Sequence, residues 1–184
     1  QMLRGLLADN RHVMLSGPSV ANEFARRLPT TVVVAGPDMS DLLLVSRLLD
    51  NDYFRTRFSD DWVGVELGGI LKNIYAIGLG LFDGKQIHSV NFRAVYLTIA
   101  LEEIARFGVA MGAKIETFLY LSGIGDLLAT SLSTHSHNRR LGELLALGMH
   151  LPEIRAEMGV LPEGYNTLQA VLYLAEKQHV SLPL

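Results

Sequence analysis

The sequence predicts an α+β protein in which a short α/β segment is followed by a longer all-α segment. In the first third, β-branched runs alternate with stretches of helical spacing, whereas after Asp60-Asp61 the strand signals almost stop. The composition, 49% hydrophobic and 19% charged, is that of a globular protein with a filled core. We therefore divide the chain into residues 1–60 and an all-α domain at 61–184, and we expect it to be mostly helical overall.

Strands are predicted where apolar residues run together and glycine or proline ends the run. TTVVVA at 30–35 is the clearest example, because it is β-branched and Gly36-Pro37 follows it directly. The next stretch has helical spacing, and Asp38 is suited to cap its first turn. The predicted order is β-α-β-α-β, with strands at 12–15, 30–35 and 54–58 and helices at 20–28 and 39–49.

Helices account for the rest of the chain, because glycine or proline interrupts a long series of helix-spaced apolar residues. The predicted helices are 61–82, 90–111, 115–121, 124–132, 136–148, 151–158 and 163–178.

The charge and the cysteine content exclude several classes of function. A net charge of −3 gives no electrostatic reason to expect nucleic-acid binding. With no cysteine, disulfides, thiolate chemistry and zinc fingers are excluded, and the six histidines lack metal spacing, so we expect no metal. The apolar stretch 63–82 is long enough to span a bilayer, but Glu66, Lys72 and its glycines oppose that reading. We expect a buried helix of a soluble protein and no membrane partner.

One charged side chain, Lys72, interrupts the apolar run WVGVELGGILKNIYAIGLGLFDG, with Asn73 beside it. On a helix, Gly69, Ala76 and Gly80 share one face with them. Small residues there would admit a substrate, a cofactor or another backbone, and a lysine so placed could exchange a proton near neutral pH. The alternative is a lysine whose stem packs at a helix–helix contact while its ammonium reaches water.

GIGDLLAT at 123–130 predicts a tight Gly-x-Gly turn that leads into a helix. Asp126 lies in the first turn of that helix, and Thr130 lies one turn later on the same face. Asp126 could orient Lys72 or accept a hydrogen bond from a substrate hydroxyl. It could equally serve the helix alone, because an acidic residue is favoured in a first turn.

Two further polar stretches could bind an anion. SHNRR at 136–140 begins a predicted helix, where free N–H groups and guanidinium groups suit a phosphate, although it could also be a solvated basic cap. Ser16-Gly17-Pro18-Ser19 joins a strand to a helix and could meet an anion or a cofactor, or be an ordinary turn. No Gly-x-Gly-x-x-Gly fingerprint follows a strand anywhere in the chain.

Taken together and in order, these segments resemble the soluble NAD(P)-dependent glycerol-3-phosphate dehydrogenases of bacterial type. The likeness covers nearly all of residues 13–184. The resemblance implies that 1–60 is the C-terminal part of a Rossmann-like dinucleotide-binding domain and that 61–184 is an incomplete all-α substrate domain. We expect a fragment of a longer protein, inactive by itself, whose cofactor turn would precede Gln1. The stretches that carry the resemblance are LSGPSVANEFARRLPT, VGVELGGILKNIYAIGLGLFDG, GIGDLLAT, SHNRRLGELL and EGYNT.

By position, the resemblance makes Lys72 the catalytic residue. It would accept the C2 hydroxyl proton of glycerol 3-phosphate while hydride passes from C2 to NAD or NADP, giving dihydroxyacetone phosphate. The implied protein is a cytoplasmic enzyme of phospholipid biosynthesis with a small-molecule substrate, and a homodimer is compatible with it. The residues implied for the substrate are Gly17, Ser19, Lys72, Asn73, Asp126, Thr130, Ser136, His137 and Asn138, and those for the cofactor are Ala21, His137, Leu161 and Glu163.

The chain departs from the family pattern at three places that we expect to lie close to the active site. His137 stands where the family usually has arginine, Ile99-Ala100 stands where it has Arg-Gly, and the loop 84–91 is one residue longer. An imidazole cannot make the bidentate contact of a guanidinium, so phosphate affinity would fall unless Arg139 or Arg140 replaces it. Two alternatives therefore stay open: a degenerate, non-catalytic homologue that serves as a structural or interaction module, and a related hydroxyacid dehydrogenase.

Overall fold

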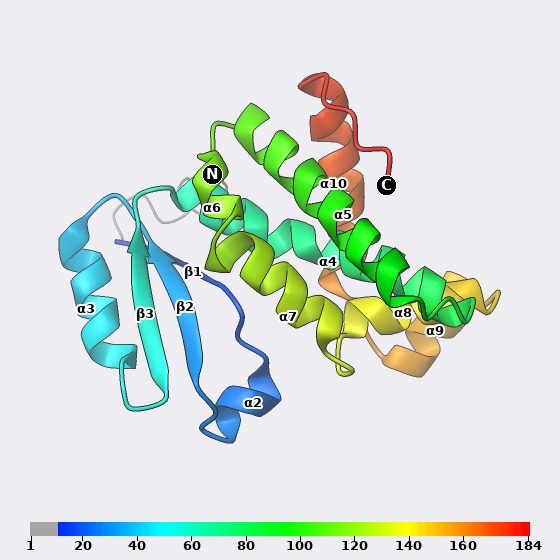
Figure 1. Cartoon of the computed structure of the whole chain (residues 1–184), viewed down its shortest axis with the longest axis horizontal. Coiled ribbons are helices and arrows are strands. Elements are labelled where there is room, and N and C mark those ends of the chain that lie inside the picture. Colours follow the sequence, from blue (N-terminus) through cyan, green and yellow to red (C-terminus); the bar gives the residue numbers. More distant parts are fainter. Residues whose placement is uncertain (1–10) are drawn as a thin grey trace.

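In the computed structural model, which describes residues 11–184, a three-stranded sheet lies beside a larger bundle of helices (Figure 1). The sheet has the order β1 (Met14–Ser16), β2 (Thr30–Ala35) and β3 (Phe54–Ser59). The strand β1 is antiparallel to β2, whereas β3 is parallel to it. A small sheet followed by a mainly helical region confirms the predicted α+β class.

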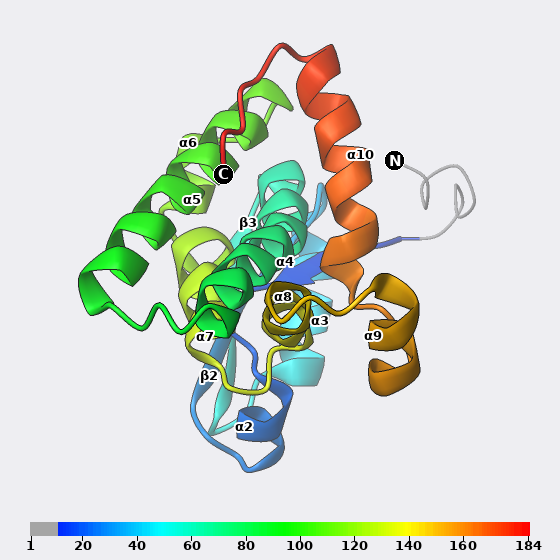
Figure 2. The same cartoon turned by 90° about the vertical axis from the view of Figure 1, so that its right-hand side faces the viewer.

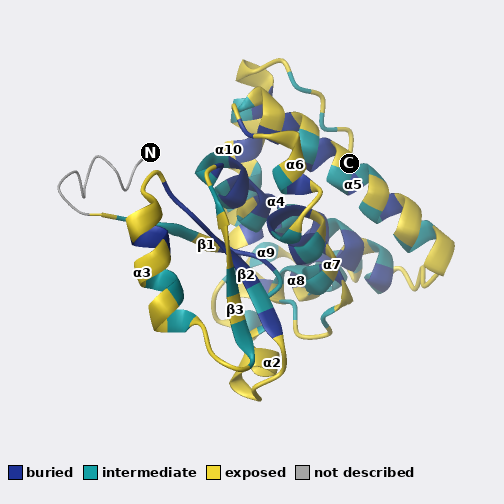
Figure 3. Ribbon diagram, turned by 60° about the vertical axis from the view of Figure 1, so that its left-hand side comes forward, coloured by how far each residue is buried: buried dark blue, intermediate teal, exposed yellow. Residues whose placement is uncertain are grey.

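Two helices belong to the sheet region, α2 (Ala21–Ala25) and α3 (Met39–Leu49). The second has the predicted bounds, and Asp38 caps it by accepting a hydrogen bond from Ser40 N at 2.8 Å. The first ends earlier than predicted, because Arg27 takes a positive φ of 61° and cannot continue the helix. Helix α3 lies on the outer face of the sheet, away from the helical bundle (Figure 3).

The inner face of the sheet packs on the start of α4 (Trp62–Gly84), the central helix of the bundle. Asp61 caps α4 through Gly64 N at 2.9 Å, and Val65 packs against Val33 of β2. Figure 2 shows α4 enclosed by the other helices. Helix α4 is apolar and long enough to cross a membrane, but over half of its most apolar window is buried inside the protein, as in the core helix of a folded domain.

Two apolar clusters hold the bundle together around α4. One joins Leu71, Tyr75 and Leu79 to side chains of α5 and α10, and the other joins Ile77 to α8 and α9. The remaining elements are α5 (Val90–Ala110), α6 (Ile115–Phe118), η1 (Leu121–Gly125), α7 (Asp126–Leu132), α8 (His137–Ala146), α9 (Leu151–Met158) and α10 (Glu163–Lys177).

The segment between α6 and α7 differs from the prediction of a helix at 115–121 followed by a tight glycine turn. Tyr120 is extended, and Leu121–Gly125 form a short π-helix that runs directly into α7. Gly123 and Gly125 have ordinary negative φ values, so neither is needed for a turn. A Cβ at Gly123 would collide with the Phe118 backbone, and one at Gly68 of α4 would collide with the Ser122 carbonyl. Close packing therefore explains glycine at position 123, against α6, and at position 68, where α4 meets η1, better than turn geometry does.

Helices α4 and α8 also meet at reciprocal glycines. A Cβ at Gly80 would collide with the Arg139 carbonyl of α8, and one at Gly142 would collide with the Ile77 carbonyl of α4. The small-residue face of α4 thus admits a second backbone at Gly80, as one of the two sequence-based readings allows. This contact places the N-terminal turn of α8 beside Lys72.

Candidate active site

The centre of the site is an ion pair between α4 and α7. Lys72 Nζ lies 2.5 Å from Asp126 Oδ1, and the two side chains are 19% and 4% exposed. The second carboxylate oxygen accepts hydrogen bonds from Gly17 N and Ser16 Oγ, each at 3.3 Å. Burial raises the pKa of the Asp126 carboxyl, and Lys72, Gly17 and Ser16 oppose the rise. This carboxyl therefore gains a proton more readily than an exposed aspartate with the same partners would.

The turn after β1 reaches Asp126 because two glycines leave room for it. Gly17 has a φ of 132°, a conformation that strains any residue with a side chain, and this conformation accompanies the contact of its N–H with Asp126. A Cβ at Gly69 of α4 would lie 2.5 Å from Ser16 Oγ. The sequence-based analysis singled out Gly69 and the stretch from Ser16 to Ser19, but it did not predict the contact of Ser16 with Asp126.

A cleft of about 1140 Å³ runs from Lys72 to the start of α8. Ser136 caps α8 by accepting from Arg139 N at 3.3 Å. Asn138 Oδ1 accepts from Gly164 N at 3.0 Å, which leaves its amide N–H groups as possible donors. His137 is exposed between these two residues and borders the cleft.

Every site residue predicted from the sequence borders this cleft or a smaller adjoining one of about 260 Å³. Lys72 borders both, so it lies where the two spaces meet. The large cleft is also bordered by Ala21, Asn73, Thr130, Ser136, His137, Asn138, Leu161 and Glu163, and the smaller one by Gly17, Ser19 and Asp126.

Arg139 and Arg140, the two arginines that follow Asn138, are engaged by carboxylates. The Arg139 guanidinium pairs with Asp83, whose carboxylate is only 4% exposed. Arg140 Nη2 lies 2.8 Å from Glu157, and Nη1 lies 3.4 Å from Glu143. The expectation that one of these arginines could replace a guanidinium at position 137 is therefore not supported by their contacts.

Asp83 is the residue of this region that sequence reasoning missed. It lies in the last turn of α4 and pairs with both Arg93 of α5 and Arg139 of α8, while His88 Nδ1 lies 3.8 Å from it. Two guanidinium groups on one buried carboxylate tie α4, α5 and α8 together next to the N-terminal turn of α8. An aspartate at the end of an otherwise apolar helix was the available signal.

Ile99, which we expect to lie close to the site, borders neither of the two clefts. Neighbouring Ala100 is fully buried in the core between α4 and α5. The loop 84–91 reaches the site only indirectly, through the approach of His88 to Asp83. Of the three departures, the one at His137 is the one that borders the cleft.

The comparisons with known proteins agree with this arrangement. A family model described as the NAD-dependent glycerol-3-phosphate dehydrogenase C-terminus matches residues 61–184. A glycerol-3-phosphate dehydrogenase [NAD(P)+] of Enterococcus faecalis is 45% identical over 172 residues, which are 94% of this chain and 50% of that protein. One of Carboxydothermus hydrogenoformans is 44% identical, covering 96% of this chain and 52% of that protein.

Solved structures give the same result. The glycerol-3-phosphate dehydrogenase of Coxiella burnetii aligns with a TM-score of 0.88 at 37% identity, over 93% of this chain and 52% of that one. The Dunaliella salina protein DsGPDH aligns with a TM-score of 0.86 at 26% identity, over 97% of this chain and 35% of that one. The chain spans about half the length of the curated relatives that it matches.

Proposed function

The chain belongs to the NAD-dependent glycerol-3-phosphate dehydrogenase family, and from this premise we propose that it forms the substrate side of such an enzyme. The whole protein would interconvert glycerol 3-phosphate and dihydroxyacetone phosphate with NAD or NADP. The observation that carries the proposal is the buried Lys72–Asp126 pair at the junction of two clefts. We propose a cytoplasmic location, which suits a chain without cysteine.

The proposed domain division places 1–60 in the dinucleotide-binding domain and 61–184 in the substrate domain. It is supported by the change of architecture between β3, which ends at Ser59, and α4, which begins at Trp62. Lys72 and Asp126 would come from the second domain, whereas Gly17 would come from the first. The reacting atoms would then lie where the two domains meet.

Lys72 Nζ would take the proton of the C2 hydroxyl group as the carbonyl forms, and it would return that proton in the reverse reaction. The amine must be neutral to do so, and Asp126 Oδ1 at 2.5 Å offers a place for its proton. Burial favours this transfer because it raises the pKa of the Asp126 carboxyl. Ser16 and Gly17 would keep the carboxylate aligned with the amine while the proton moves.

Residues on two sides of the large cleft fit a nicotinamide cofactor. Ala21 begins α2, whereas Leu161 and Glu163 lie at the start of α10, and all three border the cleft that contains Lys72. When bound there, the nicotinamide would accept the hydride that leaves C2 of the substrate. The substrate phosphate would lie at Ser136, His137 and Asn138, where the Asn138 amide can donate hydrogen bonds.

Titration of the chain with glycerol 3-phosphate, followed by amide NMR shifts, tests the proposal. We expect saturable shifts at residues 72–73, 126–130 and 136–138, with glycerol giving much smaller shifts because it lacks the phosphate. Lys72→Ala should weaken binding, while Lys85→Ala, an exposed lysine outside both clefts, should leave it unchanged. Binding that persists unchanged in a folded Lys72→Ala variant would contradict the proposed site.

A second candidate function, a non-catalytic homologue, is favoured by one observation. Arg139 and Arg140, the arginines that border the large cleft, both have carboxylate partners, so neither replaces the guanidinium expected at position 137. If glycerol 3-phosphate does not bind either to the wild-type chain or to His137→Arg, this second function becomes the better explanation.

A further inference from the structure

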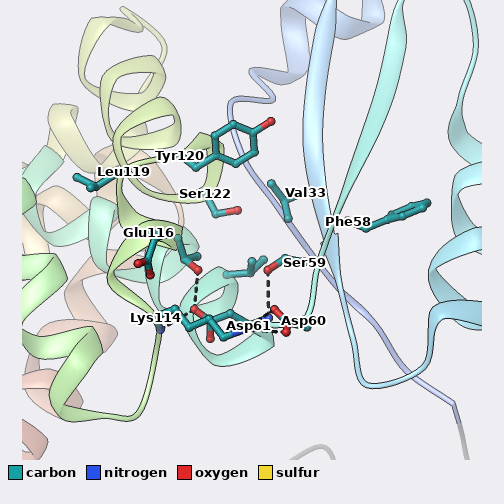
Figure 4. Close-up of a pocket in the computed structure, with 12 residues that line it drawn as sticks. Val33, Phe58, Ser59, Asp60, Asp61, Lys114, Glu116, Leu119, Tyr120 and Ser122 are labelled. Atoms are coloured by element: carbon teal, nitrogen blue, oxygen red, sulfur yellow. Dashed lines mark hydrogen bonds and ion pairs between the residues drawn. The ribbon is translucent and has the colours of Figure 1, made fainter.

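A third cleft, of about 470 Å³, lies between the sheet and the α6–η1 segment (Figure 4). Its walls come from β2, β3, the start of α4, α6 and η1. None of the residues assigned above to substrate or cofactor borders it. Its chemistry must therefore be explained separately.

The distinctive group of this cleft is the Ser122 hydroxyl. Ser122 is 1% exposed, and its Oγ has no hydrogen-bond partner among residues 11–184. In Figure 4 this hydroxyl points from η1 across the cleft toward Val33. A buried hydroxyl without a partner lowers stability, so a hydroxyl of this kind in the wall of a cleft points to a ligand that completes it.

The surroundings of Ser122 suit a flat apolar body. Val33 and Val65, exposed by 2% and 0%, form apolar walls on the sheet and on α4. Tyr120 immediately precedes η1, two residues before Ser122, and its large side chain is 52% exposed. An aromatic ring that packs on Tyr120 would cover an apolar surface that is now open to water.

The polar groups at one end of the cleft already have hydrogen-bond and ion-pair partners, and their net negative charge disfavours an anion. Asp61 Oδ2 accepts from Lys114 N at 2.8 Å and from Thr117 Oγ1 at 2.5 Å. Lys114 Nζ lies 2.7 Å from both oxygens of Asp60. With Glu116, three carboxylates face one ammonium at this border, so a phosphate or a carboxylate would be repelled.

We propose that this cleft is a binding site for a flat, uncharged heteroaromatic molecule that hydrogen-bonds to Ser122 Oγ and packs between Tyr120 and Val33. The site is independent of the proposed dehydrogenase chemistry, and its negative border distinguishes it from the phosphate site. Ser122 and Asp126 belong to one continuous helical stretch, so an occupant would contact the segment that holds Asp126.

Indole is a suitable probe, with indole-3-acetate as its anionic counterpart. In an NMR titration of the chain, we expect saturable indole shifts at 33, 65 and 119–122, and indole-3-acetate should bind about tenfold more weakly or worse. Ser122→Ala should reduce indole affinity about five- to tenfold, because the hydrogen bond is lost. Its thermal midpoint should stay equal or rise, because an unpartnered buried hydroxyl has been removed.

Ser131→Ala is the matched control. Ser131 is also 1% exposed with an unpartnered Oγ, but it does not border this cleft. This variant should keep wild-type indole affinity. The proposal is overturned if the folded wild-type chain shows no saturable indole binding, if Ser122→Ala binds indole as well as wild type does, or if indole-3-acetate binds as tightly as indole.

Discussion

Replacing His137 by arginine should strengthen binding of glycerol 3-phosphate. The cations that border the large cleft are occupied: Lys72 by Asp126, Arg139 by Asp83, and Arg140 by Glu157 and Glu143. The two neighbours of His137 are also partly used, because Ser136 caps α8 and Asn138 Oδ1 holds the start of α10. A guanidinium at 137 would thus add the charged, bidentate donor that the cleft lacks.

The size of the gain follows from the contact that would be added. A hydrogen bond to a charged group contributes about 1.5–3 kcal/mol, and a bidentate guanidinium–phosphate contact belongs to the stronger class. Since about 1.4 kcal/mol is a factor of ten, the dissociation constant should fall about 10- to 150-fold.

Isothermal titration calorimetry of the wild-type and His137→Arg chains with glycerol 3-phosphate in one buffer provides the measurement. Both proteins then meet the same ligand, so the ratio of their dissociation constants isolates position 137. His137→Gln is the matched control and should not show the gain, because its side chain cannot carry a charge. A ratio near one between wild type and His137→Arg, with measurable binding, would refute the charge argument while leaving the proposed substrate intact.

Three further outcomes follow from other parts of the site. In the whole protein, Lys72→Arg should keep an ion pair with Asp126, but kcat should fall about 10²–10⁴-fold with a smaller change in KM, because a guanidinium does not release its proton at neutral pH. A normal kcat would exclude Lys72 as the proton acceptor. Gly142→Ala should destabilise the chain by about 1–3 kcal/mol and lower its Tm by about 2–12 °C, because the added methyl group collides with α4. In the control Gly148→Ala no atom would meet the methyl group, so stability should change only through the backbone strain at a φ of 87°, and the amide shifts at 136–138 should stay in place. Because burial raises the pKa of the Asp126 carboxyl above 3.8, its contribution to stability is fully present below pH 3.8 and is lost as pH rises through the folded-state pKa. Urea denaturation should show wild type losing stability relative to Asp126→Asn over that range, and a pH-independent difference between the two would contradict a raised pKa.

Local sequence signals predicted the elements whose boundaries are set locally. β2 and α3 have the predicted limits, because a β-branched run ends at Gly36-Pro37 and Asp38 caps the next helix. The Lys72–Asp126 contact could also be predicted, because burying a charged group without a partner is unfavourable. The antiparallel pairing of β1 and the π-helical η1 were not, because they depend on contacts with distant backbone.

The same reasoning explains why the charge balance of the cleft could not be predicted. SHNRR presents two arginines, and Glu143 is the one carboxylate within five residues that could pair with them. Arg139 is paired with Asp83, which lies 56 positions earlier, and Arg140 is paired with Glu157 on another helix. Only the folded chain brings these carboxylates to the guanidinium groups.

The position of the α8 turn is set by backbone contacts rather than by the side chain at 137. Gly80 and Gly142 let α4 and α8 meet closely, and Asp83 fixes Arg139 behind the turn. His137 is exposed and makes none of these contacts, so exchanging it should not move the turn. The departure at 137 therefore changes the charge offered to a phosphate while the framework that would hold the phosphate stays in place. For this reason a single substitution to arginine can distinguish a weakened phosphate site from a cleft that has lost this ligand altogether.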